Sequence, residues 1–116
     1  MTGSRMRRVD EAIREVLGQA IVDEIQDPRL GFVTVTGVDT SPDLKHSKVY
    51  VSVLGDEDAT NDSLDALQSA HGRLQSALAG QLRLKHTPEL RFLYDDSVDR
   101  GMRVDAILEH EEEDAE

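Results

Sequence analysis

Residues 69–79, SAHGRLQSALA, place a glycine inside a stretch that otherwise has the pattern of an amphipathic helix. Leucines recur at helical spacing on both sides of Gly72, as in one buried stripe: Leu64, Leu67, Leu74, Leu78 and Leu82. Glycine inside a helix costs about 1 kcal/mol relative to alanine. The stretch therefore predicts two helical halves joined by a kink at Ala70, His71 and Gly72, rather than one straight helix or an open loop.

One long helix is expected before this segment. Residues 5–26 carry apolar side chains on one side, which is the pattern of an amphipathic helix: Met6, Val9, Ile13, Val16, Leu17, Ala20, Ile21 and Ile25. Ser4 is the predicted N-cap. Pro28 is expected to end the helix, because it disfavours helical geometry at the residue before it.

Two strands are expected next. Residues 32–38 are rich in β-branched residues, and residues 48–53 alternate apolar and polar side chains, as a half-buried strand does. The connection contains the turn residues Ser41, Pro42 and Asp43. A connection this short predicts that the two strands are antiparallel.

The acidic stretch over residues 55–63 is predicted to be a loop, with Asp62 or Ser63 as the N-cap of the second helix. That helix is expected to end before Thr87-Pro88. Leu90, Phe92 and Tyr94 alternate in a short third strand, which Asp95-Asp96-Ser97 ends. Val98, Met102 and Ile107 are the apolar positions of a weak last helix.

This element order predicts an α+β fold, α-β-β-α-(kink)-α-β, which is the order of a type II KH-like domain. We expect one such domain over residues 1–108, and an acidic, disordered tail over residues 109–116. KH domains clamp the backbone of single-stranded RNA with a GXXG loop between two helices. Here Ala70-His71-Gly72 stands in that place. Gly72 would bend the helix and expose its backbone, and it would also or instead let another element pack closely.

The composition excludes several classes of protein. The 116 residues are 38% apolar and 32% charged, which suits one modest core, and the absence of cysteine excludes disulfides and thiolate metal sites. The formal net charge is −11, and residues 105–116 hold seven acids and no Lys or Arg. This end is expected to be solvated, or else to act as an acidic arm that competes with RNA for a basic face.

No catalytic or metal site is predicted, and no cofactor is expected. The four histidines lack metal-ligand spacing: His46, His71, His86 and His110. Adjacent carboxylates at Asp95 and Asp96 would point to opposite faces of a strand. Apolar runs are too short to span a bilayer, and the start MTGSRMRR lacks the apolar part of a secretory signal, so a cytoplasmic protein is expected.

Several segments, in their order and spacing, resemble the ribosome-binding factor A family. The first are Arg5-Met6-x-Arg8-Val9, Asp27-Pro28-Arg29, residues 33–38 (VTVTGV), 41–45 (SPDLK) and 48–53 (KVYVSV). Ala70-His71-Gly72 is similar to the Ala-x-Gly kink of the family, although His71 stands where a small residue is common. Residues 88–92 (PELRF), 95–97 (DDS) and 101–103 (GMR) complete the resemblance.

The resemblance implies a KH-like assembly factor of the bacterial small subunit that is not an enzyme. Such a factor binds the free 30S subunit during late maturation, near the ends of 16S rRNA, and supports growth in the cold. Partners would be the 30S subunit, 16S rRNA and other small-subunit assembly factors, with the chain itself a monomer. The alternative from the residues alone is a protein-interaction module that binds a basic partner through its acidic surface.

Eight basic residues are the candidate RNA contacts: Arg73, Arg5, Arg7, Arg8, Arg83, Lys85, Lys45 and Lys48. Such residues would bind phosphates and orient the RNA without reading its sequence. Arg83 and Lys85 also suit a helix C-terminus for reasons of the helix dipole alone. The two strand lysines could instead guard a sheet edge, and the N-terminal arginines could simply be solvated. Arg73 is the preferred candidate, because it begins a helix rather than ends one.

Overall fold

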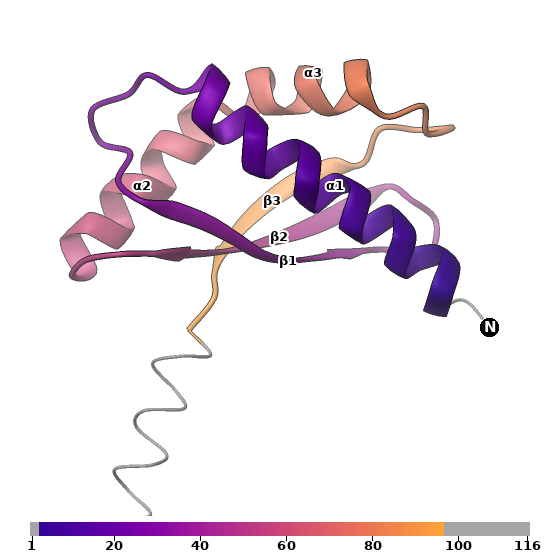
Figure 1. Cartoon of the computed structure of the whole chain (residues 1–116), viewed down its shortest axis with the longest axis horizontal. Coiled ribbons are helices and arrows are strands. Elements are labelled where there is room, and N and C mark those ends of the chain that lie inside the picture. The colour runs from indigo at the N-terminus through magenta and orange to yellow at the C-terminus, as the bar shows by residue number, and fades with distance from the viewer. Residues whose placement is uncertain (1–2, 97–116) are drawn as a thin grey trace, which may run out of the picture.

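A computed structural model describes residues 3–96, which form three helices and a three-stranded sheet (Figure 1). The elements follow one another as α1 (Gly3–Glu24), β1 (Val33–Thr40), β2 (His46–Val53), α2 (Glu57–Ser69), α3 (His71–Gln81) and β3 (Glu89–Tyr94). The predicted α+β class and element order are thus confirmed. The assignment to the KH type II class stays a prediction.

The sheet has the order β1-β2-β3, which the sequence did not predict. β1 and β2 are antiparallel, as expected, and β3 lies parallel to β2 with His46 beside Glu89 and Val51 beside Tyr94. The ladder between β1 and β2 shifts by one residue between Val35 and Gly37. Because such a bulge reverses which side chains face each way, it keeps apolar residues of β1 on one face along the whole strand.

One face of the sheet carries the core, and the helices cover it. In β2 every second residue from Ser47 to Val53 is buried, whereas Lys48 between them is exposed. The apolar residues buried in the single core cluster are Ile13, Leu17, Ala20, Ile21, Ile25, Val35, Val49, Val51, Leu67, Leu74, Leu78, Leu90 and Phe92. The predicted apolar stripe of the first helix therefore faces the core, as its periodicity indicated.

The first helix is shifted from its predicted bounds. It includes Ser4, so that the prediction of Ser4 as N-cap is wrong. At the other end it stops at Glu24, and Ile25 lies beyond the helix yet remains buried. The predicted helix was too long at this end because Ile25 matches the apolar spacing of the helix, yet it is buried in the core from a position after the helix has ended.

The start of the second helix was also predicted wrongly. α2 begins at Glu57, inside the stretch that was expected to be a loop. Its N-cap is Asp56, whose carboxylate accepts a hydrogen bond from the Ala59 N–H at 2.9 Å, rather than Asp62 or Ser63. Glu57 and Asp58 fill the first turn, where the helix dipole favours acids. The acidic residues that suggested a loop are thus signals of a helix start.

The bend lies within the predicted stretch, but at Ala70 rather than Gly72. Ala70 has φ −92° and ψ 6°, and it separates α2 from α3. Its N–H still donates to the Ala66 carbonyl, and its own carbonyl still accepts from the Leu74 N–H, each at 3.0 Å. A rotation of ψ away from the helical value of about −42° at one residue is enough to turn the chain.

Gly72 plays no packing role in this bend. It lies in the first turn of α3 without a positive φ, and a Cβ built on it would meet nothing within 4 Å. The idea that Gly72 lets another element pack closely is therefore wrong. The glycine is exposed, so its missing side chain leaves the backbone of the first turn open to the surroundings.

The predictions for the last part of the chain agree with the structure in part. α3 ends at Gln81, earlier than the expected end before Thr87, so Arg83 and Lys85 follow the helix rather than complete it. β3 confirms the predicted third strand and is one residue longer at its start. The predicted weak helix through Val98, Met102 and Ile107 and the acidic tail lie outside the described residues.

The turn into α2 offers a test of these backbone constraints. Gly55 has φ +136°, and a Cβ there would lie 2.8 Å from the Ala59 Cβ. Gly55→Ala is expected to lower the free energy of unfolding by about 1–3 kcal/mol, because it adds strain and a clash together. Gly18→Ala is the control, since Gly18 is helical with nothing near its Cβ position, and should stabilise by up to about 1 kcal/mol. Urea unfolding measures both, and an equally stable Gly55→Ala protein would contradict the strain.

Candidate nucleic-acid interface

All of the predicted basic residues except Lys48 fall near the two ends of one helix pair. α1 and α3 pack against each other and run in opposite directions (Figure 1). Arg73 in the first turn of α3 therefore lies beside the C-terminus of α1, and the chain after α3 lies beside the N-terminus of α1. Because 19 residues of helix separate Arg5 from Glu24, the two ends lie about 28 Å apart.

Three of the cations share one hollow at the second end. Arg5 of α1, together with Arg83 and Lys85 after α3, lines a concave surface whose remaining lining is apolar. All three side chains are accessible to solvent, and among residues 3–96 none of them forms an ion pair. The sequence placed these cations in separate groups, and the antiparallel helix pair brings them together. They are free to bind phosphate groups.

Of the other predicted cations, some lie near this hollow and one does not. Arg8 lies one turn from Arg5 on α1, and Arg7 is also exposed. Lys45 is exposed and directly follows Leu44, which lines the hollow. Lys48 lies instead on the uncovered face of the sheet, so it is not part of the hollow.

The uncovered face of the sheet carries one cation that sequence reasoning missed. In the strand register Lys48 lies between Asp39 of β1 and Arg91 of β3. Arg91 is exposed, and it follows the buried Leu90 in the alternating pattern of the third strand. That alternation was the available signal. These three residues lie side by side across the sheet. Because Asp39 is an acid, the positive charge here is weaker than that of the hollow.

Arg73 has a structural partner that the sequence did not indicate. Its Nη1 donates to the Glu24 carbonyl at 3.3 Å, at the C-terminal end of α1. Arg73 was preferred because the dipole of its own helix does not favour a cation there. The dipole of the neighbouring helix does, and α1 has no basic residue in its own last turn. The argument that singled out Arg73 is therefore wrong, although its role in binding stays a prediction.

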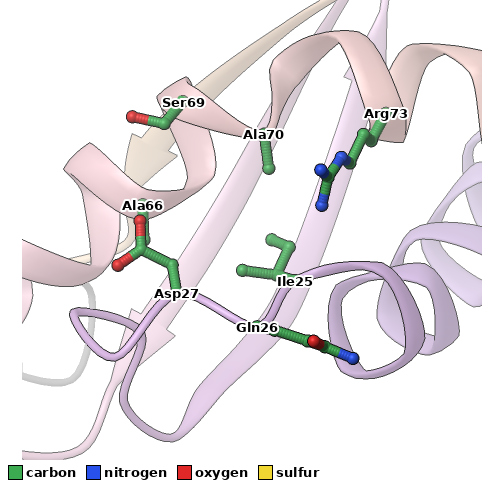
Figure 2. A pocket seen from close by; sticks show the side chains of 7 residues that line it. All are labelled: Ile25, Gln26, Asp27, Ala66, Ser69, Ala70 and Arg73. Carbon is green, nitrogen blue, oxygen red and sulfur yellow. The ribbon is translucent and has the colours of Figure 1, made fainter.

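Arg73 also lines a hollow at the bend (Figure 2). Residues 25–27, which leave α1, form one wall, and Ala66, Ser69 and Ala70 form the other. The Arg73 side chain points from α3 into the space between them (Figure 2). This hollow joins the backbone of the bend to one cation, and an anion that enters it would meet the acid Asp27 as well.

Asp27 is neutralised by Arg29. The Arg29 Nη2 donates to Asp27 Oδ2 at 2.6 Å and to the Ser69 Oγ at 3.0 Å, and the Arg29 N–H donates to Asp27 Oδ1 at 3.0 Å. The side-chain hydrogen bonds from Arg29, followed by its backbone hydrogen bond, lower the pKa of Asp27. The group ties the segment after α1 to the last residue of α2, directly before the bend.

His71 and Gln75 fasten α3 to the edge of the sheet. The His71 Nε2 lies 3.1 Å from the Leu90 carbonyl oxygen, and the Gln75 Oε1 accepts from the Leu90 N–H at 3.2 Å. The Gln75 Nε2 donates to the Pro88 carbonyl at 2.6 Å. These bonds satisfy backbone groups of an edge strand, which would otherwise be open to pairing. His71 is therefore a half-buried residue with a structural role.

Two kinds of site are absent between residues 3 and 96. No group of three or more His, Cys, Asp or Glu side chains in this range is placed to hold a metal ion. Nor does any helix of this range have the length and apolar character needed to cross a bilayer.

The Asp27–Arg29 pair predicts a pH dependence of stability. Because the pKa of Asp27 is lower in the folded state, the pair stabilises the fold above the ordinary Asp pKa of about 4, and this stability is lost as the pH falls through the folded-state pKa. The difference in melting temperature between the unsubstituted protein and Asp27→Asn should therefore be largest near pH 7 and shrink below pH ~4. Arg29→Gln should give the same profile, since it removes the other partner. A difference that does not change with pH would contradict this assignment.

Comparison with known proteins identifies the family. The sequence model described as "Ribosome-binding factor A" matches residues 5–108. Ribosome-binding factor A of Heliobacterium modesticaldum is 48% identical over 108 residues, which are 93% of this chain and 89% of that protein.

One crystal structure and one fitted homology model share the fold. The crystal structure of ribosome-binding factor A from Thermus thermophilus has a TM-score of 0.69 and 32% identity, over 77% of this chain and 94% of that one. A homology model of the Thermus thermophilus factor, fitted into a cryo-EM map of a 30S complex, has a TM-score of 0.62 and 33% identity, over 75% of this chain and 91% of that one. The chain therefore belongs to the ribosome-binding factor A family.

Proposed function

We propose that this protein is an assembly factor that binds the free 30S ribosomal subunit and contacts 16S rRNA directly. The observation that carries the proposal is the similarity to a family member that has been fitted into a map of a 30S complex. Membership of the family over residues 5–108 extends that likeness to most of the chain.

The distribution of charge supports contact with RNA. The formal net charge is −11, yet Arg5, Arg83 and Lys85 gather around one hollow. An overall acidic protein is repelled by RNA at long range, so its binding surface must concentrate cations locally. These three side chains, with Arg8 and Lys45 nearby, form the surface that we propose binds phosphates of the 16S rRNA.

The bend supports a second contact. The first N–H groups of α3 have no partners within that helix, and no side chain of the described residues caps them. Gly72 lies in this turn and is exposed. A phosphate could approach the backbone here more closely than it could beside a residue with a side chain. We propose that the bend presents backbone to folded rRNA, in place of the clamp loop of KH domains.

The proposed role needs no catalytic step. Binding at the ends of 16S rRNA would assist late maturation of the small subunit and the processing of those ends, and would matter most for growth in the cold. Other small-subunit assembly factors are the further partners we propose, with the protein acting in the cytoplasm as a monomer. These finer steps follow from the family resemblance.

Binding to the subunit should depend on salt. Co-sedimentation with 30S subunits is expected to weaken as salt rises, and binding to 70S ribosomes should be weaker than binding to 30S subunits at every salt concentration. The double variant Arg83→Ala/Lys85→Ala should bind less tightly, with a log–log salt slope shallower by about one for each phosphate that is no longer bound. Arg14→Ala, which removes a cation on α1 that already pairs with Glu11, is the control.

No binding to 30S subunits at low salt would overturn the proposal. Binding that disappears when residues 109–116 are deleted, and that the double variant leaves unchanged, would favour the alternative of a protein module with a basic partner. RNA contact predicts the opposite result, because removing an acidic tail should leave affinity for RNA equal or stronger.

Gly72→Ala separates stability from binding at the bend. The substitution should stabilise the fold by up to about 1 kcal/mol, because Gly72 is helical and has no neighbour within 4 Å of its Cβ position. It should nevertheless weaken binding to 30S subunits, since the added methyl group blocks approach to the backbone. Gly18→Ala is the matched control, another exposed helical glycine without a neighbour, and should bind as the unsubstituted protein does. Equal 30S binding by the two variants would remove the bend from the interface.

A further inference from the structure

The hollow beside the N-terminus of α1 combines cations with an apolar floor. Its lining contains three cations, Arg5, Arg83 and Lys85, and five apolar residues: Met6, Val9, Pro42, Leu44 and Leu84. No acidic side chain among residues 3–96 lines it. Val9 and Leu84 also pack against the core, but the apolar surface that they leave in the hollow suits an anion that has an apolar part.

We propose that this hollow binds one unpaired nucleotide of an RNA strand. Its base would lie against Val9, Leu44 and Leu84, and its flanking phosphates would bind the three cations. The inference rests on the proposed function, and it adds that the protein contacts an unpaired base as well as the phosphate backbone.

The dimensions of the hollow fit a ligand of this size. It is open to solvent on one side and has a volume of about 600 Å³, within the range of about 300–1,000 Å³ that is typical of small-molecule sites. Met6, Val9, Leu44 and Leu84 are each half-buried, so each keeps apolar surface that faces the hollow. Most proteins that bind single strands stack bases on aromatic side chains. Here the base would rest on aliphatic side chains, which gain from covering their apolar surface.

The backbone at Leu44 indicates that its side chain serves this site. Leu44 has φ 61° and is the only residue other than glycine with a positive φ among residues 3–96. Glycine or asparagine adopts this conformation readily, whereas leucine rarely does. A strained residue of this kind tends to persist where function requires its side chain.

The turn around Leu44 holds it rigidly in this place. The Leu44 N–H donates to the Ser41 carbonyl at 2.9 Å. The Asp43 carboxylate accepts from the Ser41 hydroxyl at 2.6 Å and from the Lys45 N–H at 3.0 Å. The hydrogen bond from Ser41, followed by that from the Lys45 backbone, lowers the pKa of Asp43, so the carboxylate stays ionised. The floor of the hollow is thus formed before a ligand arrives.

Charge selects RNA over a neutral or cationic ligand. The cations come from two segments that both line the hollow, α1 and the chain after α3, and among residues 3–96 they have no ion-pair partners. A base on the floor would then lie between phosphates that reach each segment. An acidic peptide with apolar residues would meet the same charges, and competition by such a peptide separates it from RNA.

The test uses two labelled RNA hexamers, one of uridines and one of the same length with abasic sugars. Fluorescence anisotropy at moderate salt should show that the full-length protein binds the uridine hexamer about fivefold more tightly than the abasic one, as expected for a partly buried apolar contact. Leu44→Gly should lose this preference and bind the abasic hexamer as the unsubstituted protein does. Glycine suits the positive φ, so this variant is expected to fold, and its melting curve checks that it does.

Two further variants complete the design. Arg83→Ala should weaken binding of both hexamers by the same factor, because it removes a phosphate contact rather than a base contact. Leu54→Ala is the matched control, since Leu54 is 77% exposed and lies outside the hollow. It should retain the preference for uridine.

Equal binding of the two hexamers by the unsubstituted protein would overturn the inference, and so would a preference that survives Leu44→Gly. The hollow would belong to acidic protein segments if the protein showed no preference for bases and if a peptide of residues 105–116 displaced the hexamer from the unsubstituted protein but not from Leu44→Gly. The outcome is distinguishable from failure of the proposed function. If the protein binds 30S subunits but shows no preference for bases, only the nucleotide site is refuted. If it prefers bases but does not bind 30S subunits, the proposed function is refuted and the nucleotide site is not.

Discussion

The turn of the chain at Ala70 is the constraint on which the rest of the structure depends. A three-stranded sheet with one covered face needs helices that reach from its edge at β3 to its other edge at β1. α2 contacts β2 and β3, whereas α3 packs mainly against α1 and also touches β3, and the single residue Ala70 changes the direction of the chain between the two helices. Leu67 before the bend and Leu74 after it are both fully buried in the same core. The bend thus joins two packing directions without interrupting the buried surface.

The bend also determines where charge gathers. By sending α3 back along α1 in the opposite direction, it brings the residues after α3 to the start of α1. Arg5 and Arg83 are 78 positions apart in the sequence and line the same hollow. A protein with a formal net charge of −11 acquires a basic surface in this way, although no segment of its sequence is strongly basic beyond the first few residues. The resulting field is local, as expected where salt screens charges beyond about 10 Å.

Several polar side chains of α2 and α3 fasten these helices to neighbouring elements. His71 and Gln75 bond the backbone at Leu90, and Arg73 bonds the last carbonyl of α1. Ser63, which is fully buried, accepts a hydrogen bond from the Gly31 N–H at 3.0 Å. A net hydrogen bond contributes only about 1 kcal/mol, but each of these spans elements that are distant in the sequence. Their combined effect is to hold α2 and α3 against their neighbours, and the role of Arg73 in binding stays a prediction.

The sequence by itself determined the kinds of elements and their order, because these depend on local periodicity. The spacing of Leu64 to Leu82 predicted helix on both sides of the bend, and the alternation from Val49 to Val53 predicted a half-buried strand. Family membership was also visible in the sequence, since the matching segments keep their order. Helix ends were less well determined, as Asp56 shows, because several residues nearby could cap equally well. Only the tertiary structure decided the strand order, the position of the bend at Ala70, the partner of Arg73 and the meeting of Arg5 with Arg83 and Lys85. Each of these depends on contacts between residues far apart in the chain, which no local pattern records.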